Sequence, residues 1–125
     1  MSQAQLYGPA VVPYSVILGG VIEQERKQRG WPQQGRFGEK LGLSASAYSR
    51  IESGNTAISV TQLRQIAYIL QINAQYLLNR SDLITQQLMA QGVQITHEKK
   101  DNSAAILLGL GILAAALVAV GSTTS

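Results

Sequence analysis

Two neighbouring stretches decide the fold of this chain: Phe37-Gly38-Glu39-Lys40-Leu41-Gly42-Leu43-Ser44 and Ser49-Arg50-Ile51-Glu52-Ser53-Gly54. Gly42 permits a sharp reversal of the backbone, because glycine adopts left-handed φ values at little cost. Ser44 can cap the next helix, since its hydroxyl accepts a free backbone N–H of the first turn. Leu43 fills the crease between the two helices. The pattern therefore predicts two short helices joined by a tight turn, the second over about 45–53 with Gly54 as its stop.

Further short helices are predicted on both sides of this turn, from capping residues and apolar spacing. We expect a first helix from Val16 to about Arg29 with Ser15 as its cap, and a second helix from Gln33 to Leu41. A fourth helix is expected to start at Ser59 or Thr61. Asn73 should cap a short fifth helix, and a sixth should run from Ser81 to Ala90. The expected architecture is all-α. A compact five-helix domain over 15–79 follows a loose arm over 1–14 and precedes a short helix and polar linker over 80–103.

Composition and charge narrow the function classes. The chain has 125 residues and a net charge of +3. Because it has no cysteine, disulfides and thiolate metal sites are excluded. From residue 16 to residue 80, eight bases against four acids give +4, which suits a polyanionic partner. The single histidine, His97, stands in the polar linker and is interpreted as solvated, with no metal site. No residue set indicates an enzyme or a cofactor.

The two stretches resemble the Cro/Xre-type helix-turn-helix of lambda-repressor-like DNA-binding proteins. A later pattern, Leu63-x-x-Ile66-Ala67-x-x-Leu70, is similar to the fourth helix of that family. The resemblance covers Leu18 to Leu78, about half of the chain. It implies that the third helix enters the major groove of double-stranded DNA, and that a homodimer binds two half-sites.

Site residues are carried over from the family position by position. The resemblance implies a phosphate-contacting glutamine at Gln33 or Gln34, and an internal ion pair between Arg26 and Glu52 that ties the first helix to the third. Base-facing or phosphate-facing positions are Ala45, Ser46, Ser49 and Arg50, followed by Asn55 and Thr56 in a phosphate-contacting loop. Arg50 is the one long donor, able to address guanine or a phosphate.

An apolar run occupies the end of the chain. Residues 104–121 carry no charge and no side-chain hydrogen bonder, and 122–125 form a short polar tail. As a helix the run would span ~27 Å, close to the ~30 Å core of a bilayer. We therefore expect a single transmembrane helix over 104–121 that reaches the lipid bilayer of the inner membrane. Lys99 and Lys100 predict that the N-terminal domain lies in the cytoplasm. The alternative is a buried core helix or an oligomerisation helix.

Small residues at four-residue spacing in this run predict a helix–helix contact. One set is Gly111, Ala115 and Ala119, and the other is Ala105 and Gly109. The predicted helix around Leu83 to Met89 is a second candidate for a dimer contact.

Two functions from different classes follow from these features. The first is a membrane-anchored, dimeric transcriptional regulator that binds duplex DNA. The alternative is a membrane-tethered adaptor in which the same fold binds protein, as in a cytoskeletal or assembly scaffold. The short side chains of Ala45, Ser46 and Ala47 favour the adaptor. A third, weaker interpretation makes the apolar tail a membrane-active peptide that the domain regulates.

Overall fold

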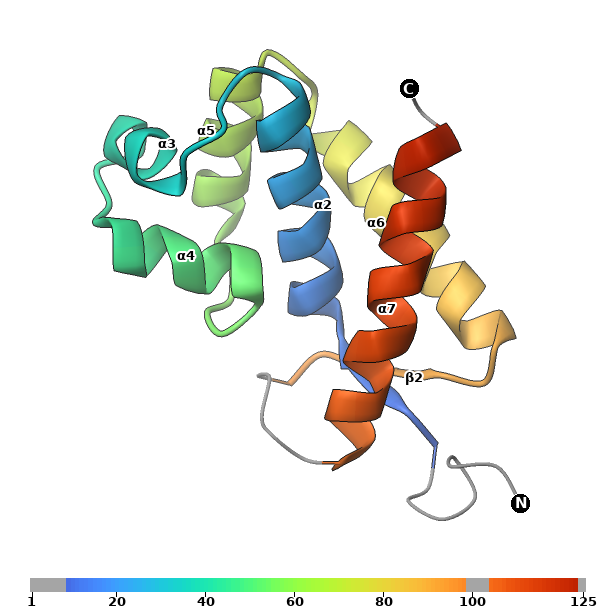
Figure 1. The fold of residues 1–125 in the computed structure, drawn as a ribbon. Coiled ribbons are helices and arrows are strands. Elements are labelled where there is room, and N and C mark those ends of the chain that lie inside the picture. The colour runs from blue at the N-terminus through green and yellow to red at the C-terminus, as the bar shows by residue number, and fades with distance from the viewer. Residues whose placement is uncertain (1–8, 99–103, 124–125) are drawn as a thin grey trace.

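The computed structural model describes residues 9–98 and 104–123, and within the last helix the side chains of 105–118. These ranges hold six helices and two short strands (Figure 1). In chain order the elements are β1 (Val11–Pro13), α2 (Tyr14–Gln28), α3 (Gln34–Lys40), α4 (Ala45–Ser53), α5 (Val60–Leu70), α6 (Ala74–Ala90), β2 (Gln94–Thr96) and α7 (Ala104–Thr123).

Helix α2 is the centre of the molecule, with α3, α4 and α5 on one side and α6 and α7 on the other (Figure 1). Two consecutive glycines let its neighbours come close. A Cβ at Gly19 would overlap the backbone carbonyl of Glu52 in α4, and a Cβ at Gly20 would lie 2.9 Å from a methyl carbon of Leu117 in α7. Larger side chains here would push α4 or α7 away from α2.

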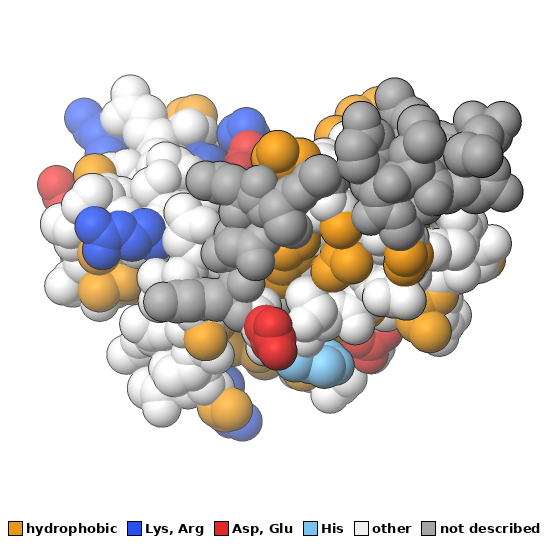
Figure 2. Space-filling view, turned by 90° about the horizontal axis from the view of Figure 1, so that it is seen from below, with side chains coloured by type: hydrophobic (Ala, Val, Ile, Leu, Met, Phe, Trp, Pro, Cys, Tyr) orange, Lys and Arg blue, Asp and Glu red, His pale blue; other side chains and the backbone are white. Residues whose placement is uncertain are grey.

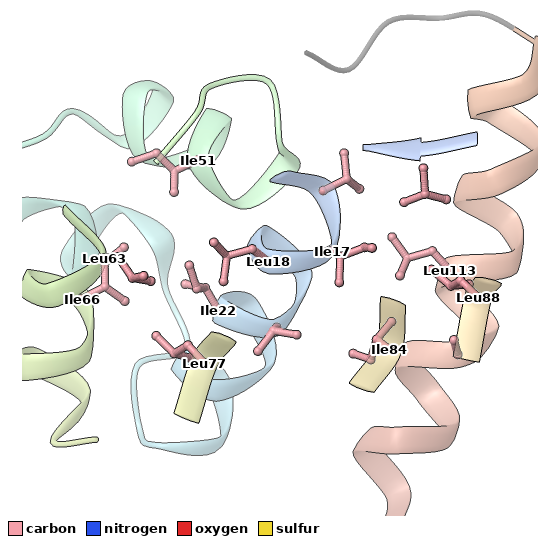
Figure 3. Packing of buried hydrophobic residues seen from close by; sticks show 14 of the residues in the cluster. Ile17, Leu18, Ile22, Ile51, Leu63, Ile66, Leu77, Ile84, Leu88 and Leu113 are labelled. Carbon is pink, nitrogen blue, oxygen red and sulfur yellow. The ribbon is translucent and has the colours of Figure 1, made fainter. Parts of the chain in front are cut away.

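One hydrophobic core runs through both sides of α2 (Figure 3). Ile17 and Ile22 of α2 are fully buried, and Figure 3 shows Leu113 of α7 close to Leu88 of α6. The other helix residues with aliphatic side chains at 0% exposure are Val21, Ile66, Leu77, Ile84 and Leu88. Helix α7 therefore contributes to the same core as the five helices before it.

Three predicted caps and one predicted stop are confirmed. The Ser44 hydroxyl accepts the backbone N–H of Ala47 at 3.1 Å, and Ser59 forms a reciprocal capping box with Gln62. Asn73 accepts the N–H of Gln75, and Gly54 ends α4 with φ +79°. Each cap satisfies a backbone donor that the first turn of a helix leaves free, which is why these residues mark helix starts in the sequence.

Two predicted helix starts are wrong. Helix α2 begins at Tyr14 after Pro13, and the Ser15 hydroxyl donates instead to the carbonyl of Gly54 at 3.1 Å. The fifth and sixth helices are one continuous α6, which also crosses the expected boundary at residues 79 and 80. Ser81 does not cap a new helix, because it is buried and its hydroxyl donates to the Leu77 carbonyl one turn earlier.

The fold is mostly helical, as expected, but the expected all-α architecture lacked one small sheet. β1 and β2 pair in parallel, with Val12 opposite Ile95, so the fold has a two-stranded sheet besides its helices. The loose arm predicted over 1–14 is therefore ordered at Val11–Pro13, where Val12 is fully buried. Three alternating residues are too short a pattern to reveal a partner more than 80 positions away. Residues 1–8 and 99–103 lie outside the described residues.

The expected membrane span is not supported. Nowhere in the described part of the chain is a helix long and apolar enough to cross a membrane. Helix α7 packs on β1, α2 and α6 (Figure 1). Its Leu113 and Ala116 side chains are buried. Gly109 lies against the backbone of Val11, and the Gln24 side chain donates to the Leu117 carbonyl at 2.8 Å. These contacts correspond to the alternative interpretation, a helix packed in the core.

Two glycines of α7 test this packing. A Cβ at Gly109 would overlap the Val11 carbonyl, whereas a Cβ at Gly111 meets nothing within 4 Å. Gly109→Ala should lower the free energy of unfolding by about 2 kcal/mol through overpacking. The matched control Gly111→Ala should raise it by up to about 1 kcal/mol, because alanine favours a helix. Urea unfolding at low protein concentration measures both, and equal effects of the two substitutions would contradict the docked position of α7.

Candidate nucleic-acid interface

Helix α4 has one face in the core and one in solvent. Tyr48, Ile51 and Glu52 are buried. Ser46 and Arg50, one turn apart, are exposed together with Ala45 at the first turn, and Ser49 is half-buried. The structure thus brings together on α4 the four side chains that the family resemblance assigns to DNA.

A buried ion pair anchors α4 to α2. Arg26 Nε lies 2.7 Å from Glu52 Oε2, and both side chains are almost completely excluded from solvent. Arg26 also donates through Nη2 to Glu52 Oε1 and through Nη1 to the backbone carbonyl of Trp31. Burial alone would lower the pKa of Arg26, but the hydrogen bond and charge of Glu52 raise it above its ordinary value. The guanidinium therefore stays charged inside the domain.

Two more side chains complete the coordination of Glu52. The Tyr48 hydroxyl donates to Oε2, and the Gln34 amide donates to Oε1 at 2.7 Å. Burial, followed by the hydrogen bond and negative charge of Glu52, raises the pKa of Tyr48, so its hydroxyl keeps the proton that it donates. One carboxylate thereby joins α2, the start of α3 and two positions of α4, which fixes the angle at which α4 is presented.

The two candidate glutamines have different environments. Gln34 turns inward to Glu52, while Gln33 is exposed at the cap position of α3. Gln33 shares a surface hollow with Arg36, an exposed base that the sequence analysis did not assign to the site. A Cβ at Gly35 would lie 3.8 Å from the Cβ of Ala45, so the first turns of α3 and α4 are side by side. Gln33 and Arg36 are therefore the better placed phosphate candidates of α3.

The loop after α4 is held by the backbone of Arg50. Its carbonyl accepts the N–H of Asn55 at 3.0 Å and the N–H of Thr56 at 3.3 Å. Both of these residues are exposed. Gly54 precedes them with positive φ and backs onto Val16, where any side chain would collide. These hydrogen bonds tie the loop to the end of α4 and keep Asn55 and Thr56 next to Arg50.

Among the described residues, Lys and Arg side chains gather at one end of the molecule in the view from below. Figure 2 shows them on the side of α3, α4 and α5. The exposed bases of α3 and α4 are Arg36, Lys40 and Arg50. In the described part of the chain none of these three forms an ion pair with an acid. This distribution suits a phosphate backbone on the side of α4.

A second buried ionic network lies on the other side of α2 and was not predicted. Glu25 accepts from Arg80 and from Arg29, each at 2.8 Å, and Arg80 also donates to the side chain of Gln24. Burial by itself would raise the pKa of Glu25, but hydrogen bonds from Arg29, Tyr76 and Arg80 lower it below its ordinary value. The available signal was an acid at position 25 within the helix predicted from Val16 to Arg29. Its partner, 55 positions away, was not readable from spacing.

The single histidine of the chain lies directly after the end of β2. His97 lies beside Tyr14, with ring centroids 6.1 Å apart. Across residues 9–98 and 104–123, no group of three or more His, Asp or Glu side chains could hold a metal ion.

The geometry of α3, the turn and α4 agrees with a comparison against family models. Residues 22–77 match the helix-turn-helix family of the Cro/Xre type. The matched segment is just under half of the chain and runs from the middle of α2 to the first turn of α6. This helix-turn-helix family consists of DNA-binding regulators. No curated protein matches the chain. No solved structure matches it either.

The anchoring role of Glu52 can be tested by removing its charge. Glu52→Gln keeps the shape but leaves the Arg26 guanidinium buried without a counter-charge, which should cost about 3 kcal/mol of folding free energy. Glu23→Gln is the matched control, because Glu23 pairs with Lys27 on the surface and should lose less than about 0.5 kcal/mol. Chemical denaturation of both variants checks this. A loss at Glu52 no larger than at Glu23 would show that the buried pair does not stabilise the fold.

Proposed function

We propose that this chain is a transcriptional regulator that binds duplex DNA through α4 and acts as a dimer. One observation carries the proposal. The helix-turn-helix segment holds α4 by a buried carboxylate and leaves Ala45, Ser46 and Arg50 in solvent at its outer face. A rigid helix with an exposed polar face and bases beside it has the form that enters a major groove.

The exposed groups match the chemistry of DNA recognition. Arg50 can donate two hydrogen bonds to guanine O6 and N7 or bind a phosphate, and Ser46 can donate or accept at a base edge. Ala45 offers only a methyl group, which can contact the methyl of thymine. Gln33 and Arg36 at the start of α3, with Asn55 and Thr56 after α4, are placed to bind phosphates on either side. Most of the affinity would then come from phosphates, and most of the sequence preference from Arg50.

We further propose that α7 works as part of the folded domain. The buried side chains of Leu113 and Ala116 and the hydrogen bond from Gln24 to the Leu117 carbonyl support this role. Residence at the inner membrane would require α7 to give up these contacts. Location at the inner membrane stays a prediction from the sequence. Partition of the full-length chain between membrane and soluble fractions checks this prediction.

The direct test is selection of DNA by the full-length chain from a pool of genomic fragments at two salt concentrations. We expect particular fragments to be enriched and affinity to fall steeply as salt rises, because each phosphate contact releases counterions. Weak, sequence-independent binding that disappears near physiological salt would contradict the proposal. The adaptor function, which the short side chains at 45–47 favour, would then take its place.

Substitution of Arg50 distinguishes a sequence-specific contact with a base from an electrostatic contact with a phosphate. On a selected site, Arg50→Ala should weaken binding by about 1–3 kcal/mol and relax the preference at one base pair. A uniform loss across sequences would assign Arg50 to a phosphate instead. Lys27→Ala is the matched control, since it removes one exposed positive charge from α2 and should change affinity by less than about 0.5 kcal/mol. Equal effects of the two substitutions would exclude α4 as the reading helix.

A further inference from the structure

Helices α6 and α7 enclose a shallow groove on the side of the molecule away from α3, α4 and α5. We call it the α6–α7 groove. Its main lining residues are Gln87, Ala90, Gln91, Gly111, Ile112 and Ala115. The Gly111 position is open, with nothing within 4 Å of an added Cβ, so a second surface can approach the α7 backbone closely here.

Large apolar side chains stand exposed at the ends of this groove. On α7, Leu107 is 55% exposed one turn before Gly111, and Val118 is 70% exposed near the other end of the described side chains. On α6, Leu83 is 57% exposed one turn before Gln87, and therefore extends the same rim. These side chains give the groove an apolar rim, and exposed apolar patches on a folded domain mark sites of association.

The polar groups of the groove favour a second copy of the chain over other occupants. Among the described residues, no charged side chain lines it, and the side-chain hydrogen-bonding groups that do are the amides of Gln87 and Gln91. An amide both donates and accepts, so each glutamine can pair with a glutamine of an identical surface related by a two-fold axis. A bilayer would leave these amides without partners in hydrocarbon. A charged peptide would find no counter-charge in the groove.

The position of the groove is compatible with DNA binding. Helix α7 reaches α2 at Gly20, whereas α4 reaches α2 at Gly19 from the other side (Figure 1). Pairing through α6 and α7 therefore leaves the outer face of α4 free in both copies. Helix-turn-helix domains that recognise two half-sites need such a pairing.

We propose that the α6–α7 groove is the homodimer interface of this protein, with each copy covering the groove and the exposed Leu107 of the other. The need for two copies rests on the proposed DNA-binding function. The choice of this surface rests on its apolar, uncharged and self-complementary composition.

The test compares two glutamate substitutions in the full-length chain. Ala115 lines the groove, and Gln86 is an exposed residue of α6 that does not. By sedimentation equilibrium, Ala115→Glu should weaken dimerisation by roughly 100-fold, because it places an unpaired carboxylate from each copy in the interface. Gln86→Glu should change it less than about threefold. Because both positions are exposed, both variants should unfold at the temperature of the original chain.

Disulfide cross-linking is a second test, and it does not require a charge to be placed in the groove. The chain has no cysteine, so one introduced thiol is unique. Oxidation should link Ala115→Cys or Gln91→Cys into covalent dimers, whereas Gln86→Cys should stay monomeric. A chain that is monomeric at about 100 µM, where even weak specific dimers form, would overturn the proposal. So would a dimer that Ala115→Glu leaves intact, or binding to anionic vesicles that Ala115→Glu abolishes.

The outcomes separate this inference from the proposed function. If both hold, Ala115→Glu retains the affinity for DNA carrying one half-site and loses only the tighter binding to two half-sites. If the chain dimerises through the groove but selects no DNA, the interface stands and the regulatory function fails. If it selects DNA as a dimer that survives Ala115→Glu, the function stands and this interface is wrong.

Discussion

The buried contact between Arg26 and Glu52 is the constraint on which the presentation of α4 depends. A charge that is removed from water must have a counter-charge and donors around it, or the fold loses several kcal/mol. Here the carboxylate satisfies that requirement with the Arg26 guanidinium, the Tyr48 hydroxyl and the Gln34 amide. Because these donors come from α2, α3 and α4, the three elements can meet in only one arrangement.

Close backbone approach is the second constraint, and it works through glycine. Gly19 admits the carbonyl end of α4, and Gly20 admits Leu117 of α7. Gly109 does the same for the backbone of β1. The central helix therefore has a functional neighbour on each side: α4, which we propose for DNA, and α7, which we propose as part of the dimer interface. This arrangement lets one small domain carry two interaction surfaces.

Local chemistry was readable from the sequence, whereas among the long-range contacts only the Arg26–Glu52 pair was expected, and that expectation came from the family resemblance. Ser44, Ser59, Asn73 and Gly54 act within one helical turn of their own position, so their roles followed from residue type and spacing. The pairing of β1 with β2 depends on partners more than 80 positions apart, which no short pattern encodes.

The C-terminal helix shows a related ambiguity of sequence. An apolar run without charge suits a bilayer and a protein core equally well, and only the contacts of α7 with β1, α2 and α6 distinguish them. In the candidate site, too, some residues could be assigned from the sequence and others only from the fold. The exposed residues of α4 came from a family resemblance, whereas the inward turn of Gln34 and the position of Arg36 beside Gln33 required the fold.

We infer that the outer face of α4, held by the buried carboxylate of Glu52, is the surface that meets DNA. The most direct measurement is an NMR titration of the isotope-labelled full-length chain with a selected duplex, following the backbone amides of the described residues. The account predicts that the largest shifts cluster at Ser46, Arg50 and Asn55, together with Arg36 at the start of α3. Shifts confined to α6 and α7, with α4 unperturbed, would contradict it.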